Sequence, residues 1–244
     1  MLKHYSTKQK AMVILNIALY LAFIYFVIVA LLKDHSISGY VFVVLGIIAL
    51  IIGTLNEYLK YLYNEALWYL NFKLDCDKAE ELYNKMVKYD IFKIHSENRG
   101  LFDVMVALER KQPRKVIEII NQNDKKFTAN VEMLLIKLYY EMRAYLSLGQ
   151  TGKINNCYTD VKNIEKMKKK PKIFQYDELD AIHEVAIGHN GEAYNKFKNV
   201  NMRNMNPKEQ KFILEQLIIT APNAEKAQYQ ELLNKLMEIV SESK

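Results

Sequence analysis

The sequence predicts an all-α protein in which two membrane-spanning helices precede a helical soluble domain. Two uninterrupted apolar runs, residues 11–32 and 38–55, lie near the N-terminus, and about 190 mostly polar residues follow them. Apolar residues in this polar part recur at i, i+3, i+4 and i+7, the period of an amphipathic helix, and no segment shows the sustained alternation of a strand. We therefore expect an N-terminal tail and transmembrane hairpin at residues 1–56 and a helical-repeat domain at residues 57–244.

Each apolar run is long enough to cross a bilayer, because about 20 residues of helix span its ~30 Å hydrocarbon core. The first run is longer than the ~7–15 apolar residues of a signal peptide, so we interpret it as a retained anchor. The connecting loop carries one lysine, Lys33, beside Asp34. The positive-inside rule then places both ends in the cytoplasm of a bacterial-type inner or plasma membrane. The basic residues near the two ends are Lys3, Lys8, Lys10, Lys60 and Lys73.

Small residues form a face on each span. Gly39, Gly46 and Gly53 recur every seven residues and so line one narrow face of the second span. Small residues let transmembrane backbones approach closely. This glycine face either packs against the first span or mediates self-association of two copies. The first span carries a similar face of small residues: Ala11, Ala18 and Ala22.

One strongly polar side chain, Asn16, lies deep in the first span. An amide in hydrocarbon needs a hydrogen-bond partner, so Asn16 bonds either to a second copy of the chain or back to its own helix. A pore would require several intramembrane ionisable groups or a polar stripe, and neither span contains them. The sequence therefore does not predict an ion pathway.

The second span is expected to continue without a break into the soluble domain. Neither proline nor glycine occurs between Gly53 and Asp75, and residues 56–63 are helix-compatible with an aromatic cluster at the expected interface. The helix should run as far as Lys73. The soluble domain would then be held at a fixed distance from the membrane.

Composition excludes several classes of function for the soluble domain. From residue 56 onward it carries 30 basic and 27 acidic side chains, a charge too mild for a nucleic-acid binder. Cys76 and Cys157 have no C-x-x-C or Cys/His spacing, which argues against zinc and against a disulfide framework. Phosphate-binding and nucleophile motifs of the types G-x-x-x-x-G-K, G-x-G-x-x-G and G-x-S-x-G do not occur. We expect no enzymatic activity and no cofactor.

Two clusters that resemble catalytic motifs have structural explanations. His183 and His189 flank Glu184, but a zinc-protease motif needs its histidines at i and i+4 on one helix face. His183 also aligns with the apolar face of its helix. Asp177 and Glu178 lie at the start of that helix, where negative charge offsets the helix dipole. We expect neither cluster to be a metal or acid/base site.

The helices come in pairs with a regular period. Second helices of successive pairs begin 37, 38, 39 and 31 residues apart, the range of helical-pair solenoids, near Ala79, Val116, Ile154, Ala193 and Ala224. In the first pair, apolar residues follow the offsets of a known two-helix unit: Tyr63, Ala66, Leu67, Leu70, Ala79, Tyr83 and Met86. Over residues 60–240 the chain resembles the tetratricopeptide-repeat family. We expect an irregular α-solenoid of this type, with a plain helical bundle as the alternative.

The resemblance implies protein or peptide binding on a concave helical surface. Such surfaces use asparagine side chains to hold a peptide backbone, and Asn64, Asn71 and Asn84 are the candidates in the first repeat. The same residues also suit an ordinary exposed helix.

A lysine cluster ends one helix of the domain. Its lysines are a solvated face that offsets the helix dipole, or they contact anionic lipid headgroups or an acidic partner. The cluster comprises Lys162, Lys166, Lys168, Lys169, Lys170 and Lys172.

These observations favour a membrane-anchored adaptor or scaffold that recruits a protein or peptide partner through its cytoplasmic domain. The alternative is a membrane effector, such as an immunity factor, a transporter accessory or a small pore-type protein, in which the hairpin is the active part. Expected partners are membrane lipid, a protein or peptide, and a second copy of the chain through the hairpin.

Overall fold

The fold is entirely helical over the part of the chain that the computed structural model describes, and this part contains no strand. The predicted all-α class is therefore confirmed. Contacts divide the chain into two compact units. We call residues 1–68 together with 77–96 the hairpin unit, and residues 69–76 together with 97–244 the array unit. The described residues are 7–33, 37–169, 171 and 173–242.

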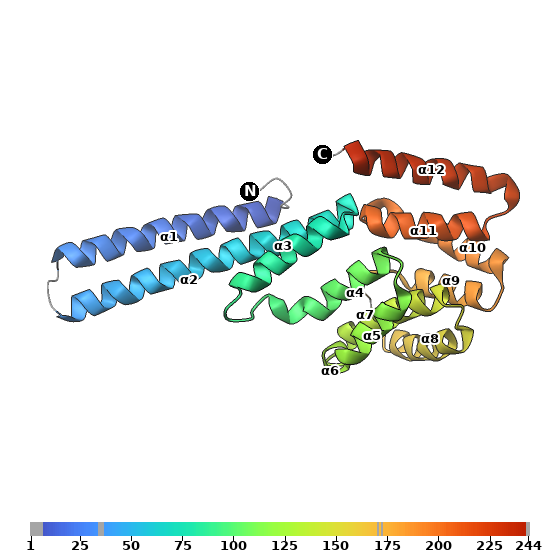
Figure 1. Cartoon of the computed structure of the whole chain (residues 1–244), viewed down its shortest axis with the longest axis horizontal. Coiled ribbons are helices and arrows are strands. Elements are labelled where there is room, and N and C mark those ends of the chain that lie inside the picture. The colour runs from blue at the N-terminus through green and yellow to red at the C-terminus, as the bar shows by residue number, and fades with distance from the viewer. Residues whose placement is uncertain (1–6, 34–36, 170, 172, 243–244) are drawn as a thin grey trace. The chain divides into compact units, whose positions relative to one another are not determined.

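The hairpin unit begins with two long helices, α1 (Thr7–Lys33) and α2 (Ile37–Trp68), which lie side by side (Figure 1). Each is long and apolar enough to cross a membrane. Only 6% of the apolar window in the first helix and 17% of that in the second are buried within the protein. The core helix of a soluble protein would be mostly buried, so these helices present apolar surface outward.

Helix α2 passes residue 56 without interruption and continues directly into a short π-helix, η1 (Tyr69–Lys73). Helix α3 (Cys76–Tyr89) then returns antiparallel along the C-terminal part of α2. The ring of Tyr63 lies 6.1 Å from that of Tyr83, and the ring of Tyr58 lies 6.4 Å from that of Tyr89. Large aromatic side chains therefore hold α3 against α2.

The array unit consists mainly of helix pairs. Each pair packs internally and also packs against the next: α4 with α5, α7 with α8, α9 with α10, and α11 with α12. Consecutive antiparallel pairs of this kind are compatible with a helical-repeat domain. The bounds are α4 Arg99–Glu109, α5 Pro113–Gln122, α6 Asp124–Phe127, α7 Val131–Ser147, α8 Thr151–Lys166, α9 Tyr176–Ala186, α10 Asn190–Asn199, α11 Pro207–Thr220 and α12 Asn223–Glu242. Of the two 3₁₀ turns, η2 (Ser96–Asn98) precedes α4, and η3 (Met202–Asn204) lies between α10 and α11.

A repeated backbone feature marks the link between the two helices of a pair. Leu74, Lys111, Gly149 and Gly188 have positive φ, and they lie 37, 38 and 39 positions apart. At each of the last three, the N–H of the following residue donates to the carbonyl five residues before it, at 2.9–3.0 Å. This is the Schellman arrangement that ends α-helices. The period seen in the sequence therefore has a counterpart in the backbone.

Helix α7 is the central helix of the array unit. It packs against α5, α8 and α9, and all residues from 138 to 144 are buried. A helix that is buried on all sides carries its polar residues into the interior as well. Glu141 and Arg143 are therefore enclosed, which sets up the site described next.

Candidate functional site

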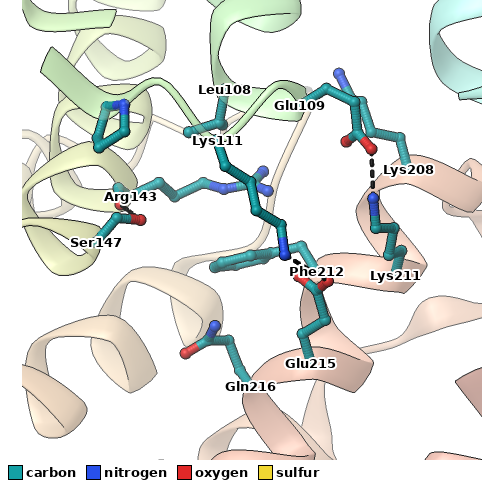
Figure 2. Close-up of a pocket in the computed structure, with 11 residues that line it drawn as sticks. Leu108, Glu109, Lys111, Arg143, Ser147, Lys208, Lys211, Phe212, Glu215 and Gln216 are labelled. Carbon is teal, nitrogen blue, oxygen red and sulfur yellow. Dashed lines mark hydrogen bonds and ion pairs between the residues drawn. The ribbon is translucent and has the colours of Figure 1, made fainter. Parts of the chain in front are cut away.

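A pocket of about 320 Å³ opens between the first, second and fourth helix pairs of the array unit (Figure 2). Helices α4, α5, α7 and α11 contribute its walls. Four cationic and two acidic side chains line it, so its lining has an excess of positive charge. The lining residues are Leu108, Glu109, Lys111, Pro113, Arg143, Ser147, Lys208, Lys211, Phe212, Glu215 and Gln216.

Arg143 reaches into this pocket from α7, and its side chain is only 7% exposed. One face of the guanidinium lies over the ring of Phe212, with Cζ 3.6 Å from the ring centroid. Nη1 donates to Glu209 Oε2 at 2.7 Å and to Tyr139 Oη at 2.8 Å. Buried Nε has no hydrogen-bond partner among the described residues. The protein thus fixes the guanidinium through Nη1, whereas Nε has a hydrogen that none of the described residues accepts.

Glu209 is held in place by the start of α11. Asn206 caps this helix, accepting from the Glu209 N–H at 3.0 Å, and proline occupies the first helical position. Buried Lys208 is next to it, with Nζ 3.5 Å from Glu209 Oε1. Burial lowers the pKa of Lys208. Burial alone would raise the pKa of Glu209, but the positive charges of Arg143 and Lys208 outweigh it and lower this pKa to about 2.

Glu178 completes the polar network below the pocket. Its Oε2 lies 3.2 Å from Tyr139 Oη, and its Oε1 accepts from the Gln175 N–H at 2.7 Å in a capping box. Burial raises the pKa of Glu178 to about 7. Glu209 Oε2 lies 2.7 Å from the same Tyr139 hydroxyl.

Counting protons shows which hydrogen bonds the neutral form of Glu178 makes with this network. The Tyr139 hydroxyl has one proton, which goes to Glu209, and two lone pairs. Arg143 donates to one lone pair. Because the single hydroxyl proton serves the shorter contact to Glu209, the 3.2 Å contact between Tyr139 Oη and Glu178 Oε2 is a hydrogen bond only when Glu178 supplies the proton. Ionised Glu178 would place a second acceptor against Tyr139 with no proton between them. With Glu178 neutral, the buried network holds two cations, Arg143 and Lys208, and one carboxylate, Glu209.

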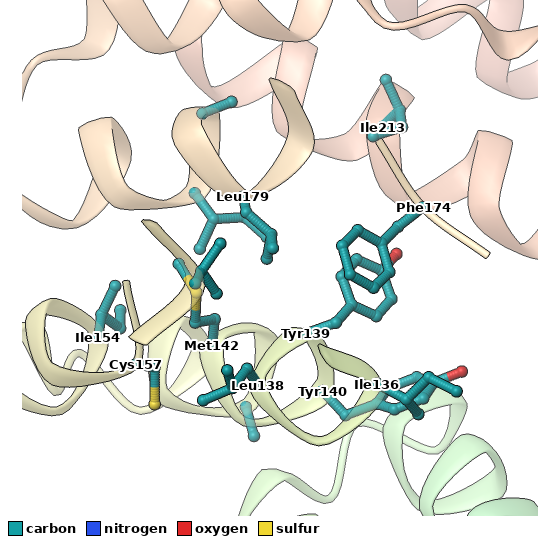
Figure 3. Packing of buried hydrophobic residues seen from close by; sticks show 14 of the residues in the cluster. Ile136, Leu138, Tyr139, Tyr140, Met142, Ile154, Cys157, Phe174, Leu179 and Ile213 are labelled. Atoms are coloured by element: carbon teal, nitrogen blue, oxygen red, sulfur yellow. The ribbon is translucent and has the colours of Figure 1, made fainter. Parts of the chain in front are cut away.

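Apolar side chains surround Tyr139, the tyrosine of this network, and Figure 3 shows several of them. The rings of Tyr139 and Phe174 stack at 4.5 Å with an interplanar angle of 3°. Leu179 and Ile213, both fully buried, bring α9 and α11 against α7. The Tyr139 hydroxyl therefore has little freedom to choose other partners.

Ion pairs cross the mouth of the pocket and join the first pair of helices to the fourth. Lys211 on α11 pairs with Glu109 on α4, and Lys111 Nζ lies 3.7 Å from Glu215 Oε1 (Figure 2). Lys111 and Glu215 are partly exposed, so their attraction is weak in water. Of these two pairs, Lys111–Glu215 is therefore the one that a ligand can displace at small cost, whereas the more buried pair Lys211–Glu109 joins α11 to α4 more firmly.

The glycine face of the second span contacts large residues of α1 in the structure. A Cβ atom at Gly46 would lie 3.0 Å from Val27 Cγ2, and one at Gly53 would lie 2.8 Å from Tyr20 Oη. Gly39 is buried as well. The three small residues of the first span are exposed, namely Ala11, Ala18 and Ala22. Self-association through a small-residue face stays a prediction.

Asn16 has a partner within the hairpin unit. Its Nδ2 donates to Glu57 Oε1 at 3.1 Å, and Lys60 Nζ lies 2.8 Å from the same oxygen. Sequence reasoning considered a second copy or the helix of Asn16 itself, and it missed Glu57 because that residue follows the apolar run.

The predicted peptide-contact asparagines occupy different environments. Asn64 is half-buried on α2, Asn84 is exposed on α3, and Asn71 is half-buried in η1. Their role in peptide binding stays a prediction.

The lysine cluster is only partly available to a partner. Lys162 Nζ lies 2.7 Å from both Glu165 and Asp180. Lys166, Lys168 and Lys169 are exposed. The two other predicted members, Lys170 and Lys172, lie outside the described residues.

The histidines on α9 and after it separate as their spacing predicts. The His183 ring stacks on Tyr158 at 3.9 Å, whereas His189 Nδ1 lies 3.1 Å from Glu184 Oε2. Glu192, which sequence reasoning did not single out, is a third potential metal ligand. Its carboxylate lies within 4.8 Å of the ligand atoms of Glu184 and His189. His189 and Glu192 are exposed.

Comparisons of the chain with protein-family models, with curated proteins and with solved structures found no match. The functional argument therefore rests on the geometry above.

Proposed function

We propose that this protein is a membrane-anchored adaptor. The hairpin α1–α2 would span the inner or plasma membrane with both chain ends in the cytoplasm, and the array unit would recruit a protein or peptide partner there. The outward apolar surface of α1 and α2 supports the anchor. The consecutive helix pairs, with their tetratricopeptide-like period, support the recruiting module.

The main observation behind the binding role is that the buried Nε of Arg143 has no hydrogen-bond partner among the described residues. A buried donor without a partner costs about 1–3 kcal/mol, which a bound acceptor removes. Guanidinium groups recognise carboxylates through two parallel N–H donors, and Nε takes part in such a fork. The positive balance of the pocket lining favours an anion. The pocket is therefore proposed to receive an acidic side chain or a C-terminal carboxylate of the partner.

Affinity capture of the full-length protein from solubilised native membranes tests this role. Arg143→Lys keeps the charge but removes the fork, and Ser147→Phe fills the pocket from an exposed position without touching the ion network. Arg203→Lys makes the same exchange at an exposed residue outside the pocket. A partner should be lost with the first two variants and retained with the third. Equal capture by all three would overturn the proposed pocket.

The runner-up is a membrane effector in which the hairpin is the active part. The exposed alanines of α1 favour it, because they offer a small-residue surface to a second copy. Crosslinking of the full-length protein in membranes, comparing Ala18→Cys with Phe26→Cys, tests it. Preferential dimer formation through position 18 would support self-association, and equal yields would count against it.

A further inference from the structure

The segment that follows α3 lies beside the residues of α2 at which the second apolar run ends. His95 Nε2 lies 3.1 Å from Oδ1 of Asn56, the first residue after that run. The His95 ring also stacks on Tyr63, at a centroid distance of 6.4 Å. Since α3 runs antiparallel to α2, with Tyr89 beside Tyr58, the residues that follow Tyr89 continue toward the apolar run. All of these residues belong to the hairpin unit.

This segment has a fixed conformation. The carboxylate of Asp90, 5% exposed, accepts hydrogen bonds from the backbone N–H groups of Ile94, His95 and Ser96 at 2.7–3.0 Å. These bonds outweigh the effect of burial and lower the pKa of Asp90. Lys93 adopts a φ of 56°, which completes the tight turn. The turn therefore holds its side chains in set directions.

The side chains that this turn presents are large, apolar and exposed. Ile91 is 75% exposed, Phe92 60% and Ile94 57%, and Lys93 lies among them. Contiguous exposed apolar side chains mark sites that contact a membrane, another protein or a ligand. We call residues 89–94 the apolar turn.

We propose that the apolar turn inserts into the interfacial layer of the same membrane that the hairpin spans, and this inference rests on the proposed insertion of the hairpin. Lipid is the occupant because the turn is held between two contacts near the end of the second apolar run, Tyr89 with Tyr58 and His95 with Asn56. The neighbouring Tyr58 and Tyr89 rings suit an interfacial aromatic belt. Lys93 can reach anionic headgroups while its apolar neighbours enter the acyl boundary.

The consequence is a third point of attachment. Two spans alone leave α2 free to tilt and rotate, whereas a turn in the interface fixes the rotation of α2 and α3 relative to the bilayer.

Fluorescence quenching by brominated lipids tests this inference on the full chain. The protein has one tryptophan, Trp68, so a Trp68→Phe background allows single probes to be placed. Phe92→Trp reports on the apolar turn, Phe42→Trp on the second span, and Met167→Trp on an equally exposed site of the array unit. The proteins are reconstituted in vesicles of phosphatidylcholine and phosphatidylglycerol, with bromine either near the headgroup or in the middle of the acyl chains.

The probe at position 92 should lose emission to shallow bromine, and its spectrum should shift to the blue relative to the probe at position 167. The probe at position 42 should be quenched by deep bromine. Quenching at position 42 with no more quenching at 92 than at 167 would overturn the apolar turn and leave the anchored hairpin intact. An unquenched probe at position 42 would overturn both.

Discussion

Replacing Glu178 with glutamine is expected to change how the stability of the chain depends on pH. Glutamine mimics a protonated glutamate, since its carbonyl oxygen can accept from the Gln175 N–H and its amide group can donate to Tyr139 Oη. The variant therefore keeps the network in the arrangement that the natural chain adopts only while Glu178 carries a proton.

The size of the effect follows from the pKa of Glu178, which burial raises from 4.5 to about 7 on folding. The folded chain holds this proton more tightly than the unfolded chain. The stabilisation is therefore complete below about pH 4.5 and is lost as the pH rises through about 7. At about 1.4 kcal/mol per pKa unit, a rise of about 2.5 units means that the natural chain loses at most about 3–4 kcal/mol of unfolding free energy that the variant keeps.

Urea unfolding of the full chain in detergent micelles, followed by circular dichroism at about pH 4 and about pH 8, measures the difference. The two proteins should be nearly equal at the lower pH, and the Glu178→Gln variant should be more stable at the higher one. Asp177→Asn is the matched control, because Asp177 is an exposed acid in the same helical turn. If Glu178→Gln changed the unfolding free energy by the same amount at both pH values, the proton count at Tyr139 would be refuted.

Three further substitutions test other parts of the structure, each by thermal or urea unfolding of the full chain. Gly188→Ala should cost about 1 kcal/mol, because φ is +86° and the added methyl group meets open space; an unchanged midpoint would contradict the helix-ending role. Glu209→Gln should cost about 3–5 kcal/mol, since the buried charge of Arg143 loses its partner, and a loss within error would show that this pair is absent. Gly53→Ala should weaken packing of α1 on α2, and adding Tyr20→Leu should restore it; failure of this rescue would contradict the glycine contact.

Helix boundaries in the array unit were predictable because local chemistry decides them. Pro113 and Pro207 begin their helices, and Gly149 and Gly188 supply the left-handed residue that ends the preceding helix. Asn206 caps α11, and Pro207 and Glu209 directly after it complete a sequence typical of a helix start. Lys111 takes the same backbone position without glycine, so this third boundary had a weaker signal.

The buried network was not predictable from local pattern. The apolar period of residues 131–147 predicts one buried face, whereas α7 is enclosed by several helices, and Arg143 therefore lies inside. Glu178 was assigned to the helix dipole, because nothing in its neighbourhood reveals that Tyr139 and Glu209 meet it in space. The signal that sequence reasoning passed over was a charged residue, Arg143, inside a strongly apolar helix.

The central claim is that the array unit, anchored by the hairpin, recruits the partner. Affinity capture from solubilised native membranes tests it most directly, comparing the full chain with a chain that ends at Ser96 and so retains residues 1–68 and 77–96 of the hairpin unit. We predict a partner that the full chain captures and the shortened chain does not. Equal capture by both would contradict the claim and would place the function in the hairpin.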